Sequence, residues 1–201
     1  MQEHPIQFDF SNKLIHLPFG TIRFGNEIMA TRTGDIILLE DVLSKTISKA
    51  ELEIKKRKTK GDAEKVGVGA IKYIILKTSP SADVQFSWEQ ALNFEGDSGP
   101  YIQYSYARAS SIIKKSGKFN KSKIKIENLN SYENNLVKKI SEFPEIIETS
   151  EKNLNPGLIA NYSFELSQLF NEFYHLFSFK YYLPGNFSTD LSHLIYYICL
   201  S

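Results

Sequence analysis

The segment from residue 93 to residue 108, N-F-E-G-D-S-G-P-Y-I-Q-Y-S-Y-A-R, constrains the fold of this chain most. Pro100 suits the first turn of a helix, because a missing backbone N–H costs nothing there. Asp97 or Ser98 can cap that helix with a side-chain oxygen, and the two glycines of the segment permit a tight turn before it. The segment therefore predicts a sharp turn that leads directly into a helix.

One face of this expected helix carries aromatic and cationic side chains. Tyr101, Tyr104 and Arg108 are spaced i, i+3 and i+7, which places them on the same side of a helix. Two stacking rings and a planar cation suit the binding of nucleic acid. An ordinary helix start with a partly buried aromatic stripe has the same spacing, so the pattern by itself leaves both interpretations open.

The charges of the chain are unevenly distributed, although the formal net charge of its 201 residues is only +1. Residues 108–125 contain seven Lys or Arg and no Asp or Glu, whereas residues 128–201 contain eight acidic and four basic residues. A basic run beside an aromatic helix is typical of a surface that binds a phosphate backbone. A solvated lysine-rich loop is the alternative interpretation.

The composition excludes several classes of protein. With 42% hydrophobic and 23% charged residues, it is typical of a globular chain of one or two domains. Cys199 is the single cysteine, which excludes a disulfide framework, and the four histidines lack metal-ligand spacing, so we expect no metal site. No signal peptide or membrane-spanning stretch is apparent. We therefore expect a cytoplasmic chain that binds no membrane.

Hydrophobic periodicity predicts a mainly α fold. We expect two strands around a turn within residues 13–24, a loop over residues 26–35 and another strand near residues 83–88. Apolar residues at helical spacing predict helices elsewhere. These helices cover residues 39–58, 63–77, 100–115, 132–142, 144–151 and 156–175.

The 93–108 segment resembles the E-G-[DN]-[ST]-G-P-Y-x-Q-Y-x-x-A-R signature of arginyl-tRNA synthetases, where the catalytic part passes into a helical anticodon-binding domain. The matching residues are Glu95, Gly96, Asp97, Ser98, Gly99, Pro100, Tyr101, Gln103, Tyr104, Ala107 and Arg108. A match of this length is much more specific than a short phosphate-loop pattern. The resemblance implies that Tyr104 and Arg108 contact tRNA.

Residues 29–35, M-A-T-R-T-G-D, are similar to the second signature loop of class I aminoacyl-tRNA synthetases, written K-M-S-T-R-K-G-N in the arginyl form. The resemblance implies a loop that closes over ATP and stabilises its phosphates as pyrophosphate leaves. The residues that match, and that we expect in this ATP loop, are Met29, Thr31, Arg32 and Gly34. Of these, Arg32 and Thr31 are the catalytic candidates.

This loop also departs from the family pattern. Ile28 stands where a lysine is usual, Ala30 replaces the serine, and Thr33 replaces the second common lysine. Arg32 is then the only cation of the loop. We therefore expect weaker stabilisation of the leaving phosphates than in a typical relative, unless groups elsewhere compensate.

Two further stretches resemble the same family. Residues 67–79 and 83–88 are similar to its G-x-G-A-x-K-[FY] run, a scaffold in which Lys72 and Lys77 are more readily interpreted as solvated than as tRNA contacts. Residues 156–174 resemble the P-x-x-[IL]-A-x-Y…F-N-x-F-Y helix of the anticodon-binding domain. On that helix we expect exposed tRNA contacts and a buried core. The contacts are Tyr162, Asn171 and Tyr174, and the core residues are Phe170 and Phe173.

The resemblance predicts four segments. Residues 1–60 form the end of the catalytic domain, a C-terminal remnant of a nucleotide-binding α/β domain, and residues 61–99 form a connecting segment. Residues 100–175 form the α-helical bundle of the anticodon-binding domain. Residues 176–201 are interpreted as a divergent or out-of-frame tail, because their only charged residues are Lys180 and Asp190.

The resemblance implies arginine–tRNA ligase activity, with ATP and its Mg²⁺, arginine and an arginine-accepting tRNA as partners, and no DNA. The H-x-G-H signature that holds ATP in class I enzymes is missing from the sequence. We therefore expect this chain to be inactive alone, to bind no cofactor by itself, and to need an N-terminal half for catalysis. A non-catalytic tRNA-binding module and a non-functional truncated product remain the alternatives.

Overall fold

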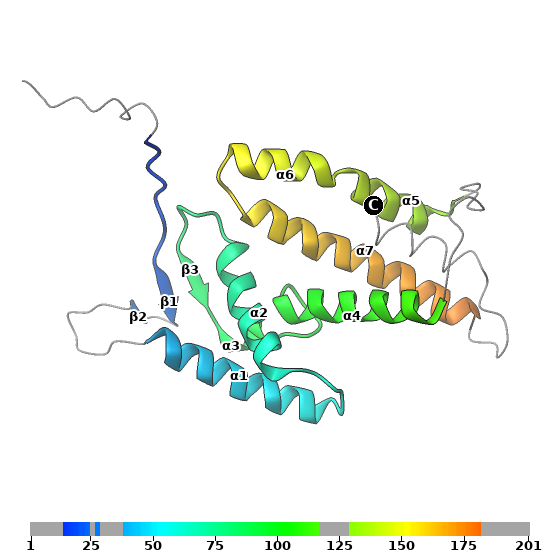
Figure 1. The fold of residues 1–201 in the computed structure, drawn as a ribbon, viewed down its shortest axis with the longest axis horizontal. Coiled ribbons are helices and arrows are strands. Elements are labelled where there is room, and N and C mark those ends of the chain that lie inside the picture. The colour runs from blue at the N-terminus through cyan, green and yellow to red at the C-terminus, as the bar shows by residue number, and fades with distance from the viewer. Residues whose placement is uncertain (1–13, 25–26, 29–37, 117–128, 182–201) are drawn as a thin grey trace, which may run out of the picture.

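A computed structural model describes residues 14–24, 27–28, 38–116 and 129–181 of the chain. The described chain is mainly helical, as expected, with a small sheet at one end (Figure 1). The strand order of the sheet is β2-β1-β3. Strand β1 (Ile22–Phe24) pairs in parallel with β3 (Val84–Phe86) and antiparallel with β2 (Glu27–Ile28). A parallel pair whose strands are joined through helices is typical of an α/β domain.

Helices α1 (Leu39–Lys56) and α2 (Ala63–Leu76) pack beside this sheet and close its core, followed by the short helix α3 (Trp88–Ala91). Their buried faces follow the expected helical spacing, with Val42, Ala50, Ala70 and Ile74 in one hydrophobic cluster. Both helices begin and end within two residues of the expected bounds. The aromatic rings of Phe24, Phe86 and Trp88 fill the space between sheet and helices.

Of the two strands expected within residues 13–24, the structure has only one, β1. Residues 14–21 form no strand, and β2 lies inside the stretch that we expected to be a loop. Leu14, Ile15 and Phe19 are at least 70% exposed, so no neighbouring element of the described chain buries them. Pro18 also lacks the N–H that a paired strand donates. High strand propensity without a pairing partner is not enough to form a strand.

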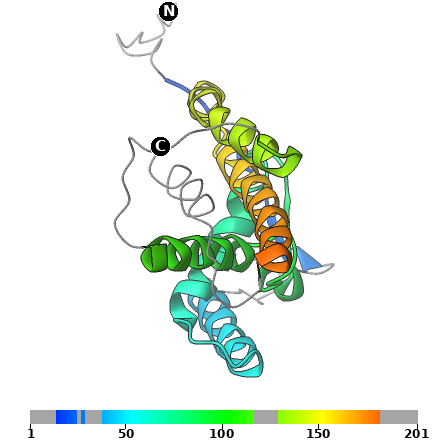
Figure 2. The same ribbon diagram turned by 90° about the vertical axis from the view of Figure 1, so that its right-hand side faces the viewer.

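The remaining helices form a bundle around α7. These are α4 (Gly99–Ser116), α5 (Ser131–Ser141), α6 (Phe143–Lys152) and α7 (Gly157–Tyr181). Leu136, Phe170 and Phe173 form the buried centre of the bundle, so the expected core positions on α7 are confirmed. Helix α7 continues beyond residue 175, where we expected it to end. Figures 1 and 2 both show α4 between α1 on one side and the α5–α7 group on the other.

The two parts meet where α2 packs closely against the start of α4. A Cβ built on Gly99 would lie 2.4 Å from the carbonyl oxygen of Gly69. One built on Gly69 would lie 2.2 Å from the side-chain nitrogen of Gln103, which donates to the carbonyl of Lys65. At position 99 only glycine fits, because two backbones approach there, whereas at position 69 the neighbour is the end of a side chain. Gly99 therefore fixes how closely these helices pack.

The turn before α4 is held by two different side chains. Ser98 is the cap, since its Oγ accepts from the backbone N–H of Tyr101 at 3.3 Å. Asp97 instead binds α2, accepting hydrogen bonds from the hydroxyl of Tyr73 and from Nζ of Lys77 at 2.9 Å. Burial and the neighbouring Asp97 carboxylate raise the pKa of Tyr73. The solvated lysine expected at position 77 is therefore wrong, because its amine is bound to Asp97.

Candidate nucleic-acid interface

A cluster of polar and aromatic side chains lies where α4 crosses α7. The guanidinium carbon of Arg108 lies 4.5 Å from the ring centroid of Tyr104 and 4.4 Å from that of Tyr174. Its Nη2 donates to the hydroxyl of Tyr104 at 2.6 Å, and its Nη1 donates to Oδ1 of Asn171 at 2.6 Å. We call Tyr104, Arg108, Asn171 and Tyr174 the arginine cluster. The structure thus brings four of the five expected tRNA contacts together.

The expected exposure of Asn171 is wrong, since this residue is only 7% exposed. Its amide nitrogen donates to Oγ of Ser105 at 2.7 Å, and that hydroxyl donates to the carbonyl of Tyr101 at 2.9 Å. The amide is therefore bound at both ends, which satisfies a buried polar group. Asn171 is therefore a buried residue whose hydrogen bond orients Arg108. The sequence pattern could not distinguish an exposed polar residue from one that is buried with partners.

Tyr162 was also expected to be exposed, and this too is wrong, because only 5% of it is exposed. Its hydroxyl donates to the carbonyl of Lys139 at 3.0 Å, and its ring packs 5.5 Å from that of Phe143. Burial raises the pKa of Tyr162. The amine of Lys139 binds Glu142 at 3.0 Å and Glu165 at 2.5 Å. Tyr162 therefore joins α5, α6 and α7, away from the arginine cluster.

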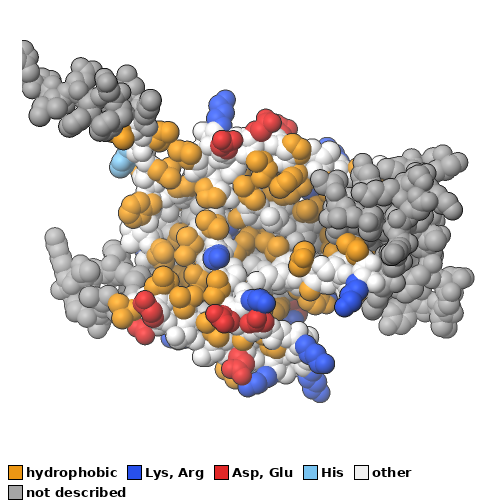
Figure 3. All heavy atoms as spheres, viewed as in Figure 1, with side chains coloured by type: hydrophobic (Ala, Val, Ile, Leu, Met, Phe, Trp, Pro, Cys, Tyr) orange, Lys and Arg blue, Asp and Glu red, His pale blue; other side chains and the backbone are white. Residues whose placement is uncertain are grey.

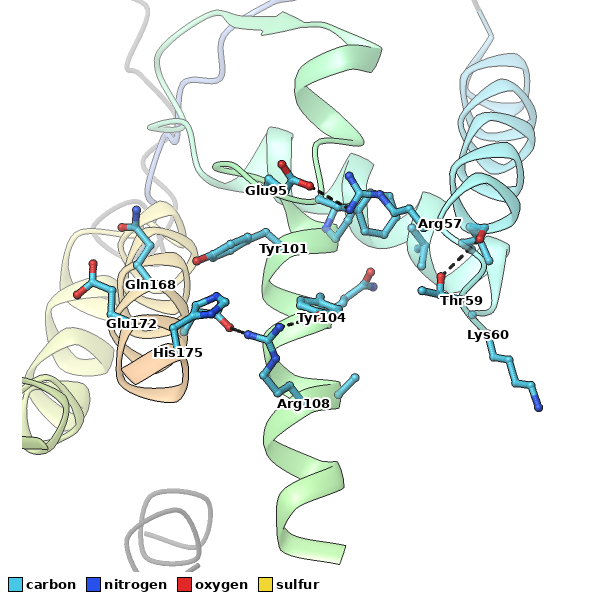
Figure 4. A pocket seen from close by; sticks show the side chains of 18 residues that line it. Arg57, Thr59, Lys60, Glu95, Tyr101, Tyr104, Arg108, Gln168, Glu172 and His175 are labelled. Atoms are coloured by element: carbon cyan, nitrogen blue, oxygen red, sulfur yellow. Dashed lines mark hydrogen bonds and ion pairs between the residues drawn. The ribbon is translucent and has the colours of Figure 1, made fainter. Parts of the chain in front are cut away.

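A groove of about 1020 Å³ opens beside the arginine cluster. Its lining comes from the C-terminal end of α1 and the residues after it, from the turn before α4, from the first half of α4 and from residues 168–175 of α7, with one residue of α2 (Figure 4). Tyr104, Arg108 and Asn171 line it, whereas Tyr174 does not line it but contacts the guanidinium of Arg108. Residues that line the groove and were not expected at a site include Arg57, Lys60, Phe94, Gln168, Glu172 and His175.

The planar side chains of this groove differ in how far other side chains cover them. The guanidinium of Arg108 lies close to two tyrosine rings, so it does not offer the open planar cation that its spacing suggested. Tyr104 is 47% exposed and has one ring face against Arg108. Its hydroxyl accepts from Arg108, which leaves its own proton free to donate. Tyr104 is therefore the more exposed of the two tyrosine rings of the arginine cluster.

A second cation lies across the groove from the arginine cluster. Arg57 binds Glu95 at 3.3 Å, and its guanidinium carbon lies 4.9 Å from the ring centroid of Phe94. The sequence could not predict the ion pair between Arg57 and Glu95, because the two residues are far apart in the chain. Ser105, by contrast, lies four residues after Tyr101 and three before Arg108, so its place on the same helix face could have been predicted.

The expected ATP loop lies outside the described residues. Met29, Thr31, Arg32 and Gly34 all lie within residues 29–37, which the structure does not describe. Most of the expected tail also lies outside the described residues. Within the described ranges, no group of three or more His, Cys, Asp or Glu could hold a metal ion. None of the described helices is long and apolar enough to cross a membrane.

Two family models match the chain in the order that the structure presents. Residues 3–88 match the model described as tRNA synthetases class I (R), catalytic domain, and residues 102–180 match the DALR anticodon binding domain. The sheet with α1–α3 thus corresponds to the catalytic domain, and the bundle to the anticodon-binding domain. These matches place the chain among the class I aminoacyl-tRNA synthetases.

The sequence relatives narrow this class. Arginine–tRNA ligases from Clostridium acetobutylicum and Streptococcus agalactiae are 36% and 38% identical over 176 and 175 residues. These alignments cover 85% and 84% of this chain but 31% of each relative. The relative from Clostridium kluyveri is 33% identical over 199 residues, which are 95% of this chain and 35% of that protein. The chain therefore spans about a third of the length of these curated relatives.

Solved structures agree with the sequence relatives. The arginyl-tRNA synthetase of Thermus thermophilus is 25% identical with a TM-score of 0.72, covering 90% of this chain and 31% of that structure. The Plasmodium falciparum arginyl-tRNA synthetase is 26% identical with a TM-score of 0.65, covering 88% of this chain and 31% of that structure. The chain belongs to the arginyl-tRNA synthetase family, as expected from its signatures.

Proposed function

We propose that this chain supplies two parts of an arginine–tRNA ligase, the surface that binds the anticodon side of the tRNA and the loop that contacts the ATP phosphates. The observation that carries the first part is the arginine cluster, which holds Tyr104 half exposed at the edge of the groove. Proteins recognise single-stranded RNA loops through bases that stack on such rings and through hydrogen bonds to base edges. Matching the DALR anticodon binding domain over residues 102–180 supports the same partner, tRNA.

Within this proposal the members of the cluster have different roles. Tyr104 receives a base on its free face and donates from its hydroxyl. Arg108 is a positioning residue, because its hydrogen bonds fix Tyr104 and Asn171 relative to each other. Tyr174 also contacts the guanidinium of Arg108. A ring held rigidly before binding loses little entropy when a base stacks on it, which favours affinity.

The ATP-phosphate role rests on the family match and on the sequence of the loop. Charge builds up on the phosphate oxygens as arginine is activated, and a nearby cation offsets it. Arg32 would supply that cation, supported by Met29, Thr31 and Gly34. Mg²⁺ would arrive with ATP as part of the substrate. Activation of arginine and its transfer to the terminal ribose of the tRNA would then require the complete enzyme.

A tRNA-binding module without catalysis is the second candidate. The observation in its favour is the loss of cations from the signature loop, with Ile28 and Thr33 where lysines are usual. Such a module would keep the groove and the arginine cluster and would not need a competent ATP loop. The two candidates share tRNA binding and differ in whether this chain can complete an active enzyme.

One experiment tests both candidates. We expect the purified chain to bind tRNA saturably, with an affinity that falls steeply with salt, and to catalyse no arginine-dependent exchange of pyrophosphate into ATP. Adding a polypeptide that carries the H-x-G-H part of a relative's catalytic domain should restore exchange if the chain is part of a ligase. Binding without restored exchange favours the module. Exchange by the chain alone would contradict its expected inactivity, and absence of tRNA binding would overturn both candidates.

A further inference from the structure

The C-terminal end of α1 carries an exposed basic run that the proposed function does not use. Residues 55–60, K-K-R-K-T-K, are all exposed. Lys55 binds Glu51 at 2.7 Å, Lys56 binds Glu53 at 3.5 Å, and Arg57 binds Glu95 at 3.3 Å. The other two lysines of the run, at positions 58 and 60, have no acidic partner within the described part of the chain. Their charges are therefore available to a ligand.

One of these lysines, Lys60, lies at the wall of the groove that is opposite α7, and Lys58 precedes it by two residues on the exposed end of α1. Lys60 lines the groove together with Arg57 and Thr59, on the opposite side of α4 from Gln168, Glu172 and His175 (Figure 4). Figure 3 shows basic side chains gathered at the lower right, where α1 ends in the same view of Figure 1. The groove therefore has aromatic and polar groups along α4 and one unpaired lysine, Lys60, at the end of α1, with Lys58 close by in the chain.

Such an arrangement matches the chemistry of an RNA strand. Grooves that bind RNA combine rings for the bases with lysines for the phosphate backbone. We propose that Lys58 and Lys60 bind backbone phosphates of the same RNA whose loop reaches Tyr104. This inference rests on the proposed tRNA binding and adds to it a contact from α1, which belongs to the part that matches the catalytic domain. The helix that follows the ATP loop would thereby contact the bound tRNA.

The backbone at Lys58 offers a test in which stability and binding change differently. Lys58 has a φ of 54°, in the left-handed region that favours glycine. It follows the helix end, where the N–H of Thr59 donates to the carbonyl of Ile54 and that of Lys58 to the carbonyl of Lys55. Glycine is the usual residue at this position of such a helix end. Lys58→Gly therefore removes the charge without straining the fold.

Leu154 provides a matched control at the end of α6. Its φ is 49°, and the N–H groups of Asn155 and Leu154 donate to the carbonyls of Ser150 and Glu151 in the same arrangement. The same backbone conformation thus occurs at a position without a basic side chain. A positive φ by itself is therefore no sign of an RNA contact. Leu154→Gly controls for the backbone change at position 58. The double change Lys138→Gln with Lys152→Gln controls for the loss of two exposed lysines elsewhere.

The experiment measures binding of an arginine-accepting tRNA transcript over a range of salt concentrations, with melting temperatures in parallel. Lys58→Gly with Lys60→Gln should weaken binding roughly five- to tenfold per lysine at about 0.1 M salt. It should also reduce the slope of log affinity against log salt by about one per lysine. Its melting temperature should equal or exceed that of the parent chain. Both control variants should bind as the parent does.

The outcomes separate this inference from the proposed function. If the parent binds tRNA and the lysine variant binds equally well with the same salt slope, the basic end of α1 is merely solvated and the inference is overturned. If the control lysines weaken binding as much, the effect is general charge attraction and the inference is again overturned. If the parent itself does not bind tRNA, the proposed function is overturned, and this inference, which rests on it, is overturned as well.

Discussion

Replacing Phe173 by alanine is expected to lower the free energy of unfolding by about 3–5 kcal/mol. Phe173 is 0% exposed and packs with Leu136 and Phe170 at the centre of the bundle. Its loss removes a large buried ring and leaves a cavity that the surrounding helices can fill only in part. Thermal or urea unfolding measures the change, which corresponds to a melting temperature lower by about 2–4 °C for each kcal/mol.

The control for this change is Phe143→Ala. Phe143 lies on α6 and is 45% exposed, so its removal should lower stability far less than removal of Phe173. Phe173 also lies on the same turns of α7 as Asn171 and Tyr174, and its loss should loosen the arginine cluster. Equal destabilisation by the two variants would contradict the assignment of the bundle core.

Replacing Arg108 by alanine is expected to weaken tRNA binding by about tenfold or more, which is the contribution of one stacked base to affinity. The change removes the cation that contacts both Tyr104 and Tyr174 and leaves the buried Oδ1 of Asn171 without its donor. Stability should therefore also fall, by about 1–3 kcal/mol for the unsatisfied amide. Binding of labelled tRNA at fixed salt, below the melting temperature of the variant, measures the first effect.

Two comparisons isolate the role of Arg108. Arg108→Lys keeps a positive charge but cannot bind Tyr104 and Asn171 with one planar fork, so it should recover only part of the affinity. Tyr106→Ala removes a ring from α4 that is 74% exposed and lies outside the groove lining, and should leave binding unchanged. Full recovery by lysine would mean that Arg108 acts as a simple charge and not as a positioning residue.

The helices of this chain could be predicted from its sequence, because their apolar residues recur at helical spacing and their ends carry recognisable signals. Pro100 and Ser98 start α4 where expected, and Phe170 and Phe173 are buried as expected. The strands were harder to predict. A strand needs a partner, and residues 14–19 have strand-forming side chains but pair with no strand of the described chain.

The candidate site could be predicted only in part. Spacing on one helix placed Tyr104 and Arg108 together, and the structure confirms that they are in contact. Spacing could not reveal that Asn171 reaches back from α7 to hold Arg108, nor that Tyr162 turns toward Lys139. The opposite wall with Arg57 and Lys60 depends on how α2 packs against both α1 and α4, which is a tertiary property. Local patterns identify such residues but not their neighbours across the fold.

The most direct test of the account is a competition experiment with parts of the tRNA. The purified chain is bound to labelled arginine-accepting tRNA, and an RNA hairpin of the anticodon arm or of the acceptor arm is added as competitor. The α4–α7 groove and the basic end of α1 predict that the anticodon-arm hairpin displaces the tRNA while the acceptor-arm hairpin does not. Displacement by the acceptor arm alone would contradict the central claim that this groove holds the anticodon side of tRNA.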